Sequence, residues 1–137
     1  KYIETGNVNF VYKDFPLNGE PSIIASEASY CAQKQNMFWE YHDTLYNNWG
    51  GENTGWITKL VLLDFAKEVG LNLDTFSQCL DNSEFRQKVL NNEQFGKDVG
   101  INATPSFLIF NDSEVYRIIG AQPFEKFEQA LQELGNS

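Results

Sequence analysis

The two cysteines, Cys31 and Cys79, are the first residues to test for chemistry, because thiols can carry out redox catalysis or hold a fold together. A dithiol catalyst keeps its cysteines about two residues apart, so that one thiolate is activated while the other resolves the intermediate. Cys31 and Cys79 lie far apart, so we do not expect them to form a redox centre. Both fall on apolar helix faces, Cys31 with Ile24 and Ala28. They are therefore either two inert core thiols or one structural disulfide.

His42 is the only histidine in the chain. One histidine does not make a zinc site, and Glu40 and Asp43 lie on adjacent helix faces, so a general-base dyad is not indicated either. We therefore predict no metal site and no cofactor. The aromatic residues of this region could form a peptide-docking surface, although aromatic residues on helices are more often part of the core. These residues are Tyr30, Trp39, Tyr41 and Tyr46.

A Thr–Pro step, Thr104-Pro105, leads directly into the short apolar run Ser106–Phe110. Proline cannot donate to a β-ladder, so it fits the first residue of a strand, and an X–Pro bond is the only one that adopts cis at low cost. Pro105 is therefore a candidate cis-proline at the entrance of a strand. A turn, a second strand over Val115–Ile119 and a helix ending at Leu134 are expected to follow.

The middle of the chain is predicted to be helical, and its helices would position both cysteines and the histidine. Apolar residues recur there at helical spacing, between short loops and glycine stops. The predicted helices span Ser22–Ala32, Gln35–Asn47, Ile57–Val69, Asp74–Leu80 and Ser83–Val99. Ser22 and Asp74 are the expected N-caps of the first and fourth helices.

The first residues have the pattern of a helix end followed by a strand. Tyr2–Asn7 is typical of a last helical turn with Gly6 at the C′ position, so we expect a helical segment before Lys1 in the parent protein. Val8–Phe15 then alternates side chains up to Pro16, which predicts a strand with one better-buried face.

Three segments, together with the Thr–Pro strand, the hairpin and the Gly120–Pro123 entry to the last helix, resemble the DsbA-like thiol–disulfide oxidoreductase family. These segments are Val11–Leu17, Ala28–Ala32 and Phe38–Tyr46. The resemblance covers nearly the whole chain, but the family's first strand and its Cys-x-x-Cys are absent. It implies an α/β protein with an incomplete thioredoxin-like fold of three α/β/α layers and an inserted all-helical domain. Residues 1–16 (truncated) and 100–137 would belong to the thioredoxin fold, and residues 17–99 to the insertion.

The resemblance also implies a function. The parent protein would be a DsbA-like protein disulfide oxidoreductase, and this chain its substrate-binding portion, redox-inactive by itself. Thr104 and Pro105 would hold the substrate, because the residue before a cis-proline can pair with an extended peptide. The alternatives are a redox-dead binding or chaperone-like module, or an isomerase or transferase of the same branch.

The partners implied by the family are cysteine-containing protein substrates and a membrane redox partner. The implied location is extracytoplasmic, whether periplasmic, secreted or membrane-anchored, although no signal segment is recognised in the chain. An even cysteine count in such a protein favours the Cys31–Cys79 disulfide slightly.

Composition limits the partners further. Ten basic residues against 19 acidic ones give a net charge of −9, which argues against nucleic acid or an anionic membrane surface as the main partner. No apolar run is long enough to span a bilayer, so membrane insertion is not expected. The absence of the family's first strand would expose two apolar strand edges, which predicts a homo-oligomer of the fragment. Its interface would bury Val8, Phe10, Tyr12 and Phe107.

Overall fold

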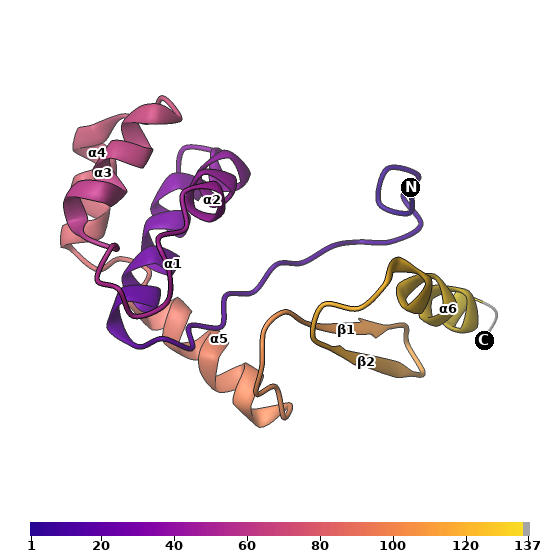
Figure 1. Cartoon of the computed structure of the whole chain (residues 1–137). Helices are drawn as coiled ribbons and strands as arrows, with labels where there is room; N and C mark the ends of the chain where they lie inside the picture. The colour runs from indigo at the N-terminus through magenta and orange to yellow at the C-terminus, as the bar shows by residue number, and fades with distance from the viewer. Residues whose placement is uncertain (136–137) are drawn as a thin grey trace. The chain divides into compact units, whose positions relative to one another are not determined.

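The computed structural model describes residues 1–135, which form six α-helices and one antiparallel β-hairpin (Figure 1). The helices are α1 (Glu20–Gln33), α2 (Phe38–Asn47), α3 (Lys59–Glu68), α4 (Leu73–Asp81), α5 (Arg86–Asp98) and α6 (Phe124–Gly135); the strands are β1 (Ser106–Phe110) and β2 (Val115–Ile119). The chain divides into two compact units, unit 1 (Lys1–Gln94) and unit 2 (Phe95–Ser137), with the boundary inside α5. Of the predicted C-terminal part, residues 136–137 lie outside the described residues.

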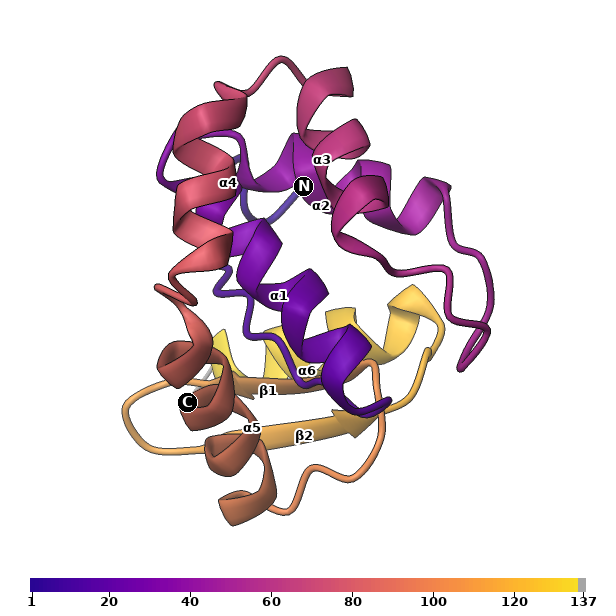
Figure 2. The same cartoon turned by 90° about the vertical axis from the view of Figure 1, so that its left-hand side faces the viewer.

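Helices α1 to α4 pack around one hydrophobic core in unit 1, and Figure 2 shows α4 running beside α1. Tyr41, Phe76 and Leu62 are its largest fully buried side chains. The Tyr41 hydroxyl donates a hydrogen bond of 2.9 Å to the Leu62 carbonyl oxygen, which satisfies a polar group that would otherwise be costly to bury. Burial also raises the pKa of Tyr41 well above its usual range.

Two helix starts differ from the sequence prediction. Helix α1 begins at Glu20 after Gly19, with Pro21 in its first turn, a position where proline needs no helical N–H partner. Asn72 caps α4, since its side chain accepts a 2.9 Å hydrogen bond from the Thr75 N–H. The predicted caps, Ser22 and Asp74, were therefore wrong, because α1 begins at Glu20 after Gly19 and α4 begins at Leu73 after Asn72.

Tyr2–Asn7 is a turn that has the capping hydrogen bonds of the predicted helix end. The Gly6 N–H donates to the Ile3 carbonyl at 3.0 Å, the Asn7 N–H donates to the Tyr2 carbonyl at 3.1 Å, and Gly6 has a φ of +74°. This pair of hydrogen bonds around a left-handed glycine is the Schellman motif.

The predicted strand at Val8–Phe15 is not a strand in the structure. Figure 1 shows the segment as a drawn-out trace, and within residues 1–135 the sheet consists of β1 and β2 alone. The prediction was wrong because alternation provides a buried face, whereas a strand also needs a partner for its backbone groups.

Unit 2 contains the predicted order of hairpin and helix. Strand β1 pairs antiparallel with β2, with Ser106 opposite Ile119. The turn is closed by Asn111, whose side-chain oxygen accepts hydrogen bonds from two backbone N–H groups at 2.8 Å each. Helix α6 lies against β1, with the Phe127 ring edge-on to Phe107 at 4.8 Å between centroids.

Candidate functional site

Thr104 and Pro105 lie together at the entrance of β1, joined by a cis peptide bond, and both are exposed. The Pro105 carbonyl accepts a 2.8 Å hydrogen bond from the Gly120 N–H, which ties the strand entrance to the loop after β2. Ser106 Oγ donates to the Ala103 carbonyl at 2.6 Å. Within residues 1–135 the Thr104 backbone groups have no hydrogen-bond partner. The arrangement leaves a short backbone edge open to an added strand.

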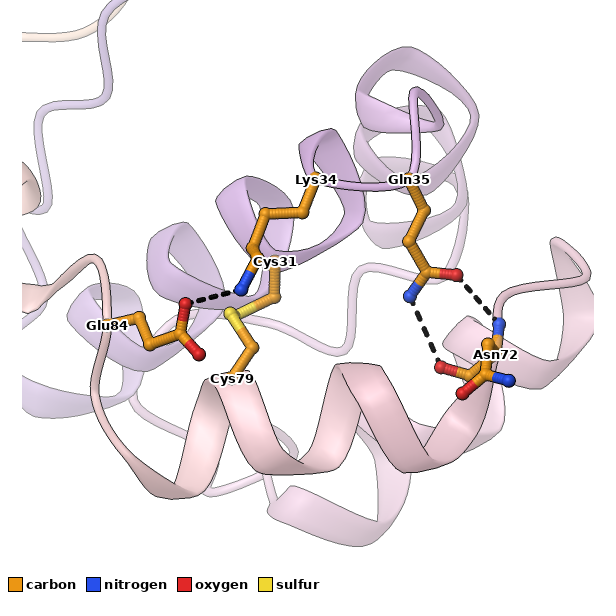
Figure 3. Close-up of a disulfide and its surroundings, with 6 residues drawn as sticks. All are labelled: Cys31, Lys34, Gln35, Asn72, Cys79 and Glu84. Carbon is orange, nitrogen blue, oxygen red and sulfur yellow. Dashed lines mark hydrogen bonds and ion pairs between the residues drawn. A yellow bond between two sulfur atoms is a disulfide. The ribbon is translucent and has the colours of Figure 1, made fainter.

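Cys31 and Cys79 form a disulfide that joins α1 to α4, with their Cα atoms 5.8 Å apart (Figure 3). Each cysteine is 1% exposed. Disulfide exchange requires a thiolate to reach a sulfur atom, and burial of both cysteines restricts that access in the folded chain. The sequence alone did not decide between two inert thiols and one disulfide. The structure contains the disulfide.

Polar contacts between the end of α1 and residues at the ends of α4 lie on both sides of the disulfide (Figure 3). Lys34 and Glu84 form an ion pair at 2.5 Å. The Gln35 side chain bonds both backbone groups of Asn72, donating to its carbonyl at 3.2 Å and accepting from its N–H at 2.8 Å. These contacts hold the end of α1 against both ends of α4.

A buried polar cluster that sequence reasoning missed anchors the end of the extended segment. The Asp14 carboxylate accepts hydrogen bonds from the Tyr30 hydroxyl and, at 2.7 Å, from the Asn92 side chain. Lys13 Nζ donates to the Asn92 oxygen at 3.2 Å. Desolvation, followed by the hydrogen bond to Asp14, raises the pKa of Tyr30. The cluster joins the extended segment to α1 and α5 within unit 1.

A second missed group is the carboxylate pair that shares Arg86. The guanidinium makes two 2.6 Å hydrogen bonds to Glu20 and lies 3.4 Å from a Glu27 oxygen. Glu27 is 2% exposed, and desolvation outweighs the attraction of Arg86, so the pKa of Glu27 is raised. The hydrogen bond to Arg86 lowers the pKa of Glu20.

The predicted aromatic residues separate into two environments. Tyr30 and Tyr41 are buried, whereas Trp39 is 47% and Tyr46 is 64% exposed. His42 packs between these two rings at centroid distances of 5.4 and 4.6 Å. Its Nδ1 atom lies 3.0 Å from an Asp43 oxygen. Part of this set is therefore core, and part forms an exposed surface on α2.

The chain matches a known family and several proteins of similar fold. A family described as "Thioredoxin" matches residues 1–133. The chain is 28% identical over 114 residues to the "Probable disulfide bond formation protein D" of Bacillus anthracis, covering 80% of this chain and 52% of that protein.

Two solved structures extend the comparison to the fold. Oxidised BdbD from Bacillus subtilis has a TM-score of 0.81 at 23% identity, covering 98% of this chain and 72% of that one. The alpha-DsbA1 of Wolbachia pipientis has a TM-score of 0.79 at 26% identity, covering 98% of this chain and 71% of that one. The chain thus belongs to the family described as Thioredoxin, and its fold is similar to that of these BdbD and DsbA structures.

Two further findings bear on the whole protein. The chain spans about half the length of the curated relatives it matches, 52% for each of the three disulfide bond formation proteins. Among residues 1–135, no helix has the length and apolar character that crossing a membrane requires.

Proposed function

We propose that this chain is the substrate-binding portion of a DsbA-like protein disulfide oxidoreductase that acts outside the cytoplasm. The observation that carries the proposal is the exposed, unpaired backbone of Thr104 beside Pro105 at the start of β1. An extended polypeptide can add its own backbone hydrogen bonds to such an edge. The similarity to disulfide bond formation protein D supports cysteine-containing polypeptides as the class of substrate.

The proposed reaction of the whole protein is dithiol–disulfide exchange. A substrate thiolate attacks one sulfur of an enzyme disulfide and forms a mixed disulfide, releasing the other enzyme sulfur as a thiolate. A second substrate thiolate then attacks the substrate sulfur of that mixed disulfide. The substrate leaves oxidised by two electrons, and the enzyme is left as a dithiol.

The 137-residue chain is itself expected to be redox-inactive, because its two cysteines are bonded to each other and buried. Insulin reduction and peptide oxidation assays measure this directly. We expect no turnover above a glutathione background. Turnover that disappears when both Cys31 and Cys79 are replaced by alanine would contradict the expectation.

Binding at Thr104 is tested with an extended peptide whose cysteine is replaced by serine. We expect the peptide to slow hydrogen exchange at the Thr104 amide. Thr104→Pro, which removes the backbone N–H, should weaken binding by about fivefold, the value of one hydrogen bond, whereas Thr104→Val should bind normally. Binding that is equal for both variants, with no change in exchange at Thr104, would contradict the assignment.

A redox-dead binding module is the second candidate, and one observation favours it. Unit 1 exposes aromatic side chains on α2 that play no part in disulfide exchange, with Trp39 47% and Tyr46 64% exposed. Activity measurements on the whole protein separate the candidates, because only the first requires oxidation of a substrate dithiol.

A further inference from the structure

Four aromatic side chains follow one face of α2 and its C-terminal end. We call Trp39, His42, Tyr46 and Trp49 the α2 stripe. The spacing of three and four residues places Trp39, His42 and Tyr46 on one side of α2, and Trp49 follows the helix end, with its N–H donating to the Tyr46 carbonyl at 3.3 Å. Trp39, Tyr46 and Trp49 are 47%, 64% and 63% exposed. An exposed patch of large aromatic side chains is unusual on a protein surface and indicates a binding surface.

The stripe is held in place by packing beneath it. The Tyr12 ring contacts Trp39 and His42 at centroid distances of 5.8 and 5.1 Å. Phe38 adds a contact to Trp39 at 5.1 Å. Because Trp39 and His42 are packed in this way, a ligand would lose little side-chain entropy by binding to these two rings.

A hollow of about 470 Å³ opens beside the first residue of the stripe. Trp39 forms one wall, and the other lining residues are Ile3, Val8, Asn9 and Phe10. This volume falls within the range of ligand-binding clefts, about 300 to 1,000 Å³. The hollow therefore has room for a large aliphatic or aromatic side chain of a polypeptide, and most of its lining residues are apolar.

The charges near the α2 stripe indicate which kind of ligand can bind there. Glu40 and Asp43 are exposed on α2, and the sequence from Phe38 to Trp49 contains no lysine or arginine. A second copy of the chain would bring another net charge of −9 to this acidic surface, and an anionic membrane would be repelled in the same way. Basic side chains complement the surface, and apolar side chains complement the aromatic rings.

We propose that the α2 stripe binds extended polypeptides that combine apolar with lysine or arginine side chains. An apolar side chain occupies the hollow beside Trp39, and the basic groups lie against Glu40 and Asp43. The surface belongs to unit 1, and the site at Thr104 belongs to unit 2. The inference rests on the proposed function only in taking unfolded polypeptides as clients.

Fluorescence anisotropy on the full chain tests the proposal with a labelled, cysteine-free peptide of leucine and lysine in a glycine–serine background. An otherwise identical peptide with glutamate in place of lysine is the comparison. We expect the lysine peptide to bind about tenfold more tightly, with a difference that shrinks at high salt. Equal affinity of the two peptides, or binding of neither, would overturn the proposal.

Variants locate the binding. Tyr46→Ser with Trp49→Ser should weaken binding of the lysine peptide about tenfold, because central aromatic residues dominate such interfaces. Leu60→Ser is the matched apolar control, since Leu60 is 75% exposed on α3, away from the stripe sequence. Glu40→Gln with Asp43→Asn should weaken binding about fivefold, and Glu68→Gln should leave it unchanged. Stripe variants that bind like the unaltered chain would overturn the assignment.

Two further measurements test peptide binding at the stripe without relying on the folding of the variants or on the site at Thr104. In the unaltered chain, the lysine peptide should shield exposed tryptophan fluorescence from a neutral quencher. Thr104→Pro should leave this binding unchanged, so failure at one site is distinguishable from failure at the other. If the stripe variants instead abolish self-association in sedimentation, or binding to phosphatidylcholine vesicles, a second copy or a membrane is the occupant and the proposal is wrong.

Discussion

Unit 1 encloses a hydrophobic core, whereas unit 2 is a hairpin and a helix with little buried apolar surface. Most of the buried apolar side chains belong to unit 1, and in unit 2 only Ala130 and Leu134 reach that class among the described residues. Unit 2 instead exposes Phe110, Val115 and Phe124 by 55% to 70%. A segment of this size with so small a core is marginal by itself. Stability therefore resides mainly in the helical unit, whereas the unit with the Thr–Pro strand depends on local pairing.

The largest expected loss of stability comes from removing a buried aromatic ring from the core of unit 1. Phe76 is fully buried and its ring lies 5.3 Å from that of Tyr41. Phe76→Ala should reduce the free energy of unfolding by about 3 to 5 kcal/mol, the usual loss for a buried phenylalanine. Phe124→Ala, in the exposed position of unit 2, should cost less than about 1 kcal/mol. Urea unfolding followed by far-UV circular dichroism measures both, and similar losses would contradict the contrast.

The second test removes the disulfide between Cys31 and Cys79. Its residues are separated by 48 positions, and closing a loop of that length stabilises the fold by about 4 kcal/mol in the chain-entropy model. Replacing both Cys31 and Cys79 by alanine should therefore lower the free energy of unfolding by several kcal/mol. Hydrogen exchange should speed up in α1 and α4 but not in the β1–β2 hairpin. An equal acceleration in the hairpin would show that the two units unfold together.

Sequence reasoning found the features that are local. Helical spacing placed the helices of unit 1 to within a few residues, and the glycine signal found the Schellman motif at Gly6. The hairpin and the last helix followed from the Thr–Pro step and the turn before β2. Each of these patterns is decided by neighbouring residues, which is why the sequence is sufficient to predict it.

The features it missed depend on residues that are distant in the sequence. Asp14 meets Asn92 across 78 positions, and Glu20 meets Arg86 across 66. The available signal was an acidic residue beside small or apolar residues: Asp14 precedes Phe15 and Pro16, and Glu27 lies between Ser26 and Ala28. That signal indicates a buried carboxylate but not its partner. The strand predicted at Val8–Phe15 failed for the same reason, since pairing is a long-range property.

A smaller effect is the pH dependence of stability, which has opposite signs for Glu27 and Glu20, the two carboxylates that contact Arg86. Because desolvation raises the pKa of Glu27, the folded chain binds this proton more tightly than the unfolded chain, so stability from this group falls as pH rises through the window between its usual pKa and the raised one. Glu20 has the opposite sign: its pKa is lowered by Arg86, so its contribution is lost as pH falls through the lowered value.

Unfolding measured across the acidic range tests these signs. Glu27→Gln should remove the loss of stability with rising pH, whereas Glu20→Gln should remove a gain. Glu68→Gln, on an exposed part of α3, is the control and should change neither slope. If the Glu27 and Glu20 variants shift the pH profile in the same direction, the burial argument for Glu27 is wrong.

The smallest expected effect concerns association of chains through the extended segment. The sequence predicted a homo-oligomer, and this remains a prediction. Val11 is 76% exposed, while Tyr12 already packs on α2 and needs no second chain to bury it. The segment thus offers an apolar side chain and a backbone edge, and a net charge of −9 on each chain opposes pairing.

We therefore expect weak, reversible dimers that increase with salt, because salt screens the repulsion between like charges. Sedimentation over a range of concentrations measures the association. Val11→Lys should reduce it, since a lysine on a strand edge opposes pairing, whereas Val115→Lys on the hairpin should not. A single monomeric species at every concentration and salt level would show that the extended segment needs no partner, and that its open edge is a stable surface of unit 1.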